Sequence, residues 1–228
     1  MTGEHQPETP DLSKRQGEKP LHIPGAGTLG ISLLVGSLSV LFVSSLIGYI
    51  SYWFSFPRPV SVHLPWGLWL STAVLLVSSF TIHGAWSAIR RDQQSTCRKA
   101  LLTALILGLT FLGLQIWNWT EIYGALRSAD HALNALNPQY PSPTGGMRMA
   151  HALVYEKKAI LAAFFFFTVL HALHVLGGLI PLGVVNAKAR HGDYSRNYHP
   201  GVRYCLIYWH FLDAAWILIF ITLLITFQ

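Results

Sequence analysis

The sequence has few charged residues. Of its 228 residues, 11% are Asp, Glu, Lys or Arg and 52% are hydrophobic, whereas a soluble domain carries about 25% charged residues. Its long apolar segments hold one acidic residue in their interior, Asp213, and one at an edge, Glu121. A soluble core does not need apolar runs of about 20 residues, but a bilayer does. This shortage of charge excludes a soluble enzyme.

Cysteine is scarce as well. Cys97 and Cys205 are too few and too far apart for a disulfide framework or a zinc knuckle. Patterns typical of catalytic nucleophiles, phosphate-binding loops and metal hydrolases are absent. The net charge of +6 comes from basic residues in the gaps between the apolar segments. No basic stripe with interleaved aromatics is present, so the charge does not indicate a nucleic-acid partner.

Five apolar segments are each long enough to cross a bilayer as a helix. They span residues 29–53, 67–89, 100–121, 159–186 and 204–227. The sequence therefore predicts an all-α polytopic membrane protein, a bundle of five transmembrane helices. Because Pro181 removes a backbone donor from the fourth segment, we expect a kink or a helix end there. The polar, proline-containing residues 1–28 are expected to form a disordered cytoplasmic tail.

The distribution of basic residues predicts an orientation. Most of the 16 Lys and Arg residues lie in the N-terminal tail and in the gaps 90–99 and 187–203. Because cytoplasmic loops are enriched in Lys and Arg, we expect the N-terminus inside and the C-terminus outside. The longest gap, 123–158, then forms an outer loop, with turns and extended chain expected over 137–146.

Polar side chains within the apolar segments are costly and need a reason. Four histidines lie there: His83, His171, His174 and His210. A spacing of i, i+3 places His171 with His174 on one helix face, and His210 with Asp213 on another. The helical rise of 1.5 Å per residue puts His83, His174, His210 and Asp213 at similar depths in the inner half. We expect these four residues to form one buried polar cluster.

A second polar stripe, nearer the outside, follows i, i+3, i+6 on the third segment as Gln115, Asn118 and Glu121. The simplest interpretation of both polar groups is that they hydrogen-bond helices together. Histidines at matching depth on different helices are also suited to bind haem. An intramembrane carboxylate is, in addition, typical of a proton or ion path.

Residues 208–216 are Tyr-Trp-His-Phe-Leu-Asp-Ala-Ala-Trp, and residues 168–175 are Thr-Val-Leu-His-Ala-Leu-His-Val. These stretches resemble subunit III of the haem-copper terminal oxidases, whose motifs are Trp-His-Phe-x-Asp-x-x-Trp and Thr-Gly-x-His-Gly-x-His-Val. Residues 70–83 and 113–115 continue the match, so the resemblance extends over about residues 29–228. The five-helix count is similar to bacterial forms that lack the family's first two helices.

The sequence departs from the family pattern at several positions. Ser37 is followed by Leu38 where the family usually has a Ser-Glu pair, and Asn118 stands where Glu is frequent. Val169 and Ala172 replace the glycines beside the first family histidine. The chain therefore resembles a divergent member, and any role of the missing helix-one glutamate does not carry over.

The resemblance implies a non-catalytic subunit of a respiratory complex in the inner membrane of a bacterium. That complex reduces oxygen to water with electrons from cytochrome c or quinol and pumps protons. The chain itself holds no haem, copper or other metal; it packs against catalytic subunit I, in a complex with subunit II, and binds phospholipid in a cleft. The residues implied in helix packing and the lipid cleft are His171, His174, Trp209, His210, Asp213 and Trp216, beside the polar residues His83, Gln115, Asn118 and Glu121.

Three alternatives stay open. The first is the related accessory protein of nitric oxide reductases, which shares these motifs. The second is a b-type cytochrome that binds haem through His83, His174 or His210. The third is a transporter or channel, which the single intramembrane charge and the lack of paired broken helices disfavour.

Overall fold

The computed structural model describes residues 26–55, 64–136 and 145–226. Within these ranges the chain forms helices and no strand. The helices are α1 (Ala26–Phe54), α2 (Gly67–Arg90), α3 (Gln94–Leu136), α4 (Gly145–His191) and α5 (Pro200–Thr226). All five are long and apolar enough to cross a membrane, which confirms the predicted all-α membrane class. The predicted tail lies, as far as residue 25, outside the described residues.

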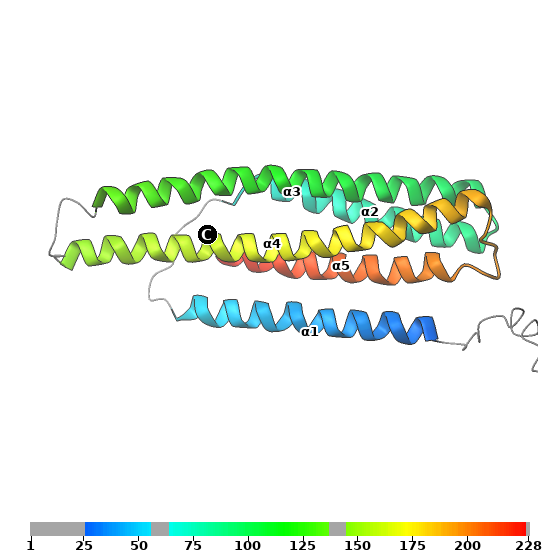
Figure 1. The fold of residues 1–228 in the computed structure, drawn as a ribbon, viewed down its shortest axis with the longest axis horizontal. Helices are drawn as coiled ribbons and strands as arrows, with labels where there is room; N and C mark the ends of the chain where they lie inside the picture. Colours follow the sequence, from blue (N-terminus) through cyan, green and yellow to red (C-terminus); the bar gives the residue numbers. More distant parts are fainter. Residues whose placement is uncertain (1–25, 56–63, 137–144, 227–228) are drawn as a thin grey trace, which may run out of the picture.

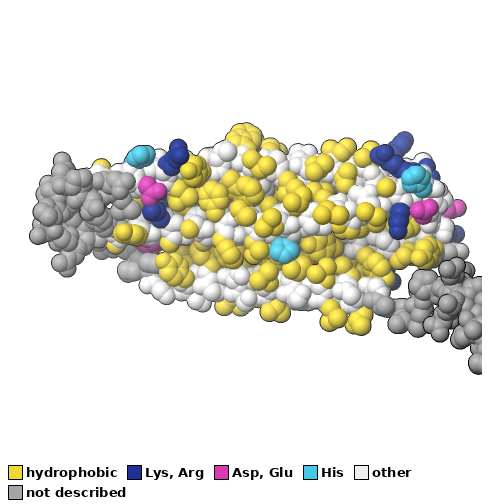
Figure 2. Space-filling view, viewed as in Figure 1, with side chains coloured by type: hydrophobic (Ala, Val, Ile, Leu, Met, Phe, Trp, Pro, Cys, Tyr) yellow, Lys and Arg dark blue, Asp and Glu magenta, His cyan; other side chains and the backbone are white. Residues whose placement is uncertain are grey.

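Consecutive helices run in opposite directions, and α1 runs along the outside of the bundle formed by the other four (Figure 1). In the apolar stretch of α1, 11% of the residues are buried, against 56% in α5. Helix α5 contacts α1, α2 and α4, so it holds the outer helix to the rest. Hydrophobic side chains cover the middle of the visible face, and charged side chains gather near its two ends (Figure 2). This is the surface that a bilayer requires.

One end of the bundle, which we call the basic end, is where α1, α3 and α5 begin and α2 and α4 end (Figure 1). Tight turns close the helices there. After α4, Gly192 adopts a φ of +84° while the Asp193 N–H donates to the Lys188 carbonyl at 3.2 Å, a helix end that favours glycine. Helix α5 then opens with Pro200, whose missing N–H costs nothing at a first helical position.

Helices α3 and α4 are longer than a bilayer needs. They contain 43 and 47 residues, which corresponds to roughly 65 and 70 Å at 1.5 Å per residue. At the end opposite the basic end they project as a helical hairpin (Figure 1), where Lys158 pairs with Asp130 at 2.5 Å. Residues 123–136 and 145–158, expected in a loop, are therefore helical. The centre of that loop, 137–144, lies outside the described residues.

Helix α4 continues through Pro181 to His191 rather than ending at the proline. The C-terminal part of α4 bends away from the line of its first part (Figure 1). A proline inside a helix removes one i→i−4 hydrogen bond and crowds the preceding turn, which is a known cause of such bends. The structure therefore has the kink and not the helix end.

Candidate functional site

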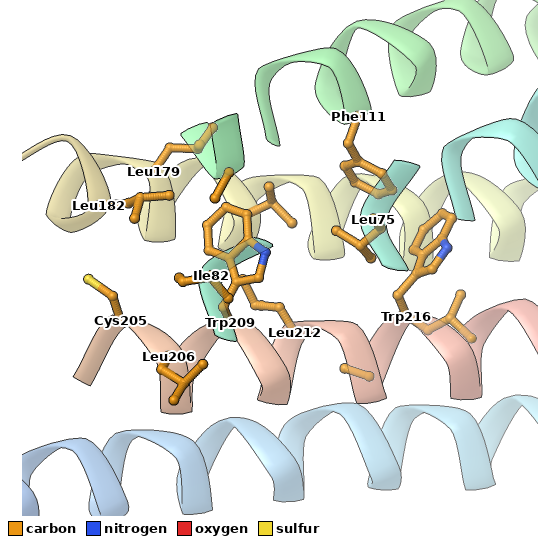
Figure 3. Close-up of a cluster of buried hydrophobic side chains, with 14 of the residues drawn as sticks. Leu75, Ile82, Phe111, Leu179, Leu182, Cys205, Leu206, Trp209, Leu212 and Trp216 are labelled. Carbon is orange, nitrogen blue, oxygen red and sulfur yellow. The ribbon is translucent and has the colours of Figure 1, made fainter. Parts of the chain in front are cut away.

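The inner face of α5 carries two buried tryptophans, Trp209 and Trp216. A separation of seven residues is close to two helical turns, so both lie on one face. Trp209 Nε1 donates to Ser78 Oγ at 3.0 Å, and Trp216 Nε1 donates to Thr72 Oγ1 at 2.9 Å. Both indoles point from α5 into the space between the other bundle helices (Figure 3). They therefore tie α5 to α2 at two levels, with each buried N–H satisfied.

Helix α3 joins the contact at Trp209. The Ser78 hydroxyl donates to the Ala104 carbonyl of α3 at 3.4 Å. One turn further along α3, a Cβ on Gly108 would lie 2.9 Å from the Trp209 ring and 2.8 Å from the Leu179 side chain of α4. These distances are shorter than van der Waals contact, so glycine at this position lets α3, α4 and α5 meet closely.

The three residues of the predicted polar stripe on α3 do not share one environment in the structure. Gln115 and Asn118 are buried, and Gln115 Nε2 donates to Ser71 Oγ of α2 at 3.2 Å. Glu121 is exposed. Each three-residue step along a helix falls about 60° short of a full turn. Two such steps rotate Glu121 away from the face on which Gln115 contacts α2.

A contact that the sequence interpretation missed lies between α3 and α4. Trp119 of α3 donates its Nε1 to Thr168 Oγ1 of α4 at 2.9 Å. Thr168 is buried and in turn donates to the Phe164 carbonyl at 2.8 Å. The available signal was the spacing of Thr168 and His171, which lie three residues apart and therefore share a helix face.

His171 and His174 of α4 occupy different environments. His171 is fully buried among the rings of Phe42, Phe111 and Trp216, with centroids 6.2, 5.7 and 5.0 Å away. Neither of its ring nitrogens has a hydrogen-bond partner within the described part of the chain. His174 is half-buried against Phe42, and its Nδ1 lies 2.7 Å from its own helix's carbonyl at position 170. Because a carbonyl only accepts, this Nδ1 carries the proton.

Ser79, His83, His210 and Asp213 form a group that we call the outer polar patch. His210 Nδ1 lies 2.8 Å from Ser79 Oγ and 3.7 Å from Asp213 Oδ2. The rings of His83 and His210 are 5.9 Å apart. The His210 side chain is 43% exposed and the Asp213 side chain 7%, and His83 is exposed as well.

The expected single cluster is therefore not formed. His83, His210 and Asp213 come together, but no hydrogen bond or ring contact among the described residues joins His174 to them. The depths predicted along the helices were correct for the three residues that lie together, His83, His210 and Asp213. Position around the helix axis, which depth does not specify, sends His174 toward Phe42 of α1 instead.

The chain also has an apolar groove near the basic end, between α1, α4 and α5. Its volume is ≈ 390 Å³, and its walls include Ile31, Leu34, Gly178, Pro181, Tyr204 and Tyr208. Tyr208 donates its hydroxyl to the His174 carbonyl at 3.1 Å. As for metals, the described ranges contain no group of three or more His, Cys, Asp or Glu side chains placed to hold an ion.

Comparison with known proteins places these contacts in a family. The family model for cytochrome c oxidase subunit III matches residues 151–226, which contain most of α4 and all of α5. A cytochrome c oxidase subunit 3 of Thermostichus vulcanus is 30% identical over 157 residues, 68% of this chain and 64% of that protein. A probable cytochrome c oxidase subunit 3 of Rickettsia prowazekii is 29% identical over 153 residues, 66% of this chain and 45% of that protein.

A third relative, the cytochrome c oxidase subunit 3 of a Synechocystis species, is 24% identical over 206 residues, 87% of this chain and 75% of that protein. The chain spans less than two thirds of the length of the first two relatives. The matched region holds the two motifs whose tryptophans and histidines pack the bundle. The chain therefore belongs to the cytochrome c oxidase subunit III family.

Proposed function

We propose that this chain is a subunit III of a haem-copper terminal oxidase and contributes no redox centre of its own. The observation that supports this most is that the tryptophans of the family motif on α5 take part in helix packing. Trp209 and Trp216 are hydrogen-bonded to Ser78 and Thr72 of α2 and packed in the core. A motif whose side chains are engaged in helix packing supports a scaffold, not a set of cofactor ligands.

In this proposal the complex reduces oxygen to water with electrons from cytochrome c or quinol and pumps protons. The chain packs against catalytic subunit I, in a complex with copper-bearing subunit II, in the cytoplasmic membrane of a bacterium. Its N-terminus lies inside and its C-terminus outside. The Lys and Arg residues of the basic end support that orientation, because cytoplasmic loops are enriched in them.

Purification of the tagged chain from its native membranes, with mass spectrometry of what remains bound, tests the proposal. We expect a haem-copper subunit I and a copper-bearing subunit II to be recovered. Recovery of nitric oxide reductase subunits would assign the chain to that complex instead. A chain that is recovered alone would contradict a role as a subunit.

The absence of a redox centre has a separate test. His174 is held by its own helix through Nδ1, and Asp213 contacts His210. We expect His174→Ala and Asp213→Ala to weaken assembly or endurance during turnover and to leave the haem spectrum of the complex unchanged. Loss of a haem band in either variant, or a haem band in the isolated chain, would favour a b-type cytochrome.

The groove between α1, α4 and α5 is proposed to hold a phospholipid chain, since its walls are apolar. Gly177 is one of its lining residues, and nothing lies within 4 Å of a Cβ built there. Gly177→Leu should place its side chain at the groove, whereas Gly84→Leu, whose Cβ is equally open on α2, should not reach it. Native mass spectrometry should detect one bound phospholipid fewer in Gly177→Leu alone. Equal lipid content in both variants would contradict the lipid site.

A further inference from the structure

A hollow lies at the basic end of the bundle, where α3 begins and α4 ends (Figure 1). We call it the basic pocket. Its volume of ≈ 320 Å³ is within the range of about 300–1,000 Å³ that is usual for small-molecule sites. It shares no lining residue with the apolar groove between α1, α4 and α5. The lining residues are Ser95, Arg98, Lys99 and Leu102 of α3 and Arg190 of α4.

Three cationic side chains line the basic pocket without a carboxylate to neutralise them. Arg98, Lys99 and Arg190 make no ion pair within the described ranges. Asp193 follows Arg190 by three residues and is still not within ion-pair distance of it. Like charges held together by two packed helices repel one another. An anion placed between them would therefore be attracted by all three.

These cations are accessible to a molecule outside the chain. Lys99 and Arg190 are exposed. Arg98 is half-buried, and its Nε is covered by the chain. Its Nη2 donates to Gln94 Oε1 of the same helix at 3.4 Å, whereas its Nη1 makes no hydrogen bond with the described residues and is not among the covered atoms. The outer end of the guanidinium therefore still has N–H groups to donate.

Arginines at other places in the bundle have partners within the chain. The Arg90 guanidinium stacks on Trp86, 4.6 Å from the ring centre, and the Arg127 guanidinium stacks on Tyr123, 4.9 Å from the ring centre. No such ring contact is made by the cations of the basic pocket in the described part of the chain. Their charge is thus left for a ligand.

The membrane side of the basic pocket is apolar. Helix α3 starts at Gln94, so Arg98 lies roughly 6 Å and Leu102 roughly 12 Å along it. Ile106 and Leu109 continue along the face of Leu102, and both are 53% exposed. Cations at the helix end are therefore followed by an apolar surface in the bilayer. A soluble anion would use the cations alone, whereas a phospholipid would use both.

We infer that the basic pocket binds the phosphate headgroup of an anionic phospholipid, whose acyl chain lies along the apolar face of α3. Arg98 and Arg190 donate N–H groups to phosphate oxygens from two helices, and Lys99 adds a positive charge. Basic pockets between membrane helices are suited to such headgroups. This inference goes beyond the proposed function, because it holds whichever complex contains the chain.

Binding of defined lipids tests the inference. The tagged chain is purified in detergent with the subunits that remain bound, and phosphatidylglycerol or phosphatidylcholine with the same acyl chains is titrated in. Native mass spectrometry counts the bound lipids. Both lipids carry a phosphate, but phosphatidylcholine has no net charge. We expect tighter binding of phosphatidylglycerol, and equal affinity for the two lipids would overturn the inference.

Substitutions locate the binding. We expect Arg98→Gln and Arg190→Gln each to lower the affinity for phosphatidylglycerol about fivefold, and the two together about 25-fold. Arg203→Gln is the matched control, because Arg203 is exposed at the same end on α5 and does not line the basic pocket. It should change the affinity less than twofold. Equal affinities in the double variant and in Arg203→Gln would overturn the inference.

Two further measurements complete the test. Inorganic phosphate in excess should displace little phosphatidylglycerol, because it cannot use the apolar face of α3. Full displacement would assign the basic pocket to a soluble anion instead of a lipid. The unfolding curve of each variant is recorded as well. If Arg98→Gln destabilises the chain, Lys99→Gln at an exposed position provides the same comparison with Arg203→Gln.

Discussion

The polar atoms of Trp209 and Trp216 are bonded differently from those of Asp213, which is also buried on α5, and from those of the partly exposed His210. The tryptophans are buried, and each indole N–H donates to a hydroxyl of α2. His210 is partly exposed, and both oxygens of Asp213 lack a hydrogen bond from the described residues. One helix therefore carries buried polar atoms that are hydrogen-bonded within the described part of the chain and buried polar atoms that are not.

The comparison predicts different effects for substitutions at the two kinds of position. Interactions completed within the chain stabilise the chain by itself, so removing them should lower its free energy of unfolding. Buried polar groups left without a partner cost free energy, so replacing them with an apolar side chain of similar size should leave the stability unchanged or raise it. Substitution of the tryptophans should therefore destabilise the chain, and substitution of Asp213 by an apolar residue should not.

The largest effect is expected from Trp209→Ala, which removes the indole from the core and its hydrogen bond to Ser78. We expect a loss of about 3–5 kcal/mol in the free energy of unfolding, the range for truncating a large buried aromatic. Denaturant unfolding of the chain in detergent, followed by circular dichroism, measures it. Trp117→Ala, at an exposed position of α3, should have little effect, and equal losses would contradict the inner-face role.

Gly108→Ala should give the next largest effect. The added methyl group would press against Trp209 and Leu179, and overpacking of this kind costs about 1–3 kcal/mol. Gly113→Ala on the same helix meets no atom within 4 Å and should instead stabilise by about 0.5–1 kcal/mol through helix propensity. The same unfolding assay applies, and the same sign for both variants would contradict close packing at position 108.

Trp119→Phe tests whether the satisfied polar contacts extend to α3 and α4. It keeps an aromatic ring and removes the donor to Thr168, so we expect a loss of about 0.5–1.5 kcal/mol. A double-mutant cycle with Thr168→Val isolates the pair, because the second substitution should cost little once the first is present. Strictly additive losses would show that the hydrogen bond contributes nothing.

Asp213→Leu should have the smallest effect on the chain alone. Because the Asp213 oxygens accept no hydrogen bond from the described residues that the substitution would remove, we expect the free energy of unfolding to change by no more than about 0.5 kcal/mol or to rise. The measurement is the same unfolding curve, read beside that of Trp209→Ala. A loss as large as that of Trp209→Ala would show that Asp213 stabilises the chain as the tryptophans do and would contradict the comparison.

Helix length shows one limit of the sequence interpretation. Hydropathy located the apolar segments because a bilayer sets a minimum run of apolar residues. Hydropathy did not reveal that α3 continues as far as Leu136 or that α4 already begins at Gly145. Residues 123–136 are rich in Ala and Leu, which favour a helix whether or not lipid surrounds them. A helix can therefore leave the membrane without any break in its backbone hydrogen bonds.

The direction in which each side chain points from its helix is the second limit of the sequence interpretation. The i, i+3 spacing correctly predicted that His210 and Asp213 lie together, because both are on one helix. His171 and His174 have the same spacing, yet one is buried in the core and the other contacts Phe42 at its edge. Spacing states which residues share a side of a helix, and the neighbouring helices decide which part of that side is covered.

The sequence alone determined the all-α membrane class, its five apolar helices and the family motifs, since these depend on composition and local spacing. Only the tertiary structure decided that Trp119 reaches Thr168, that Gly108 admits Trp209, and that the buried Asp213 accepts no hydrogen bond from the described residues. Each of these depends on how one helix is rotated and placed against another. That arrangement is set by the packing of all the helices together, which no single segment specifies.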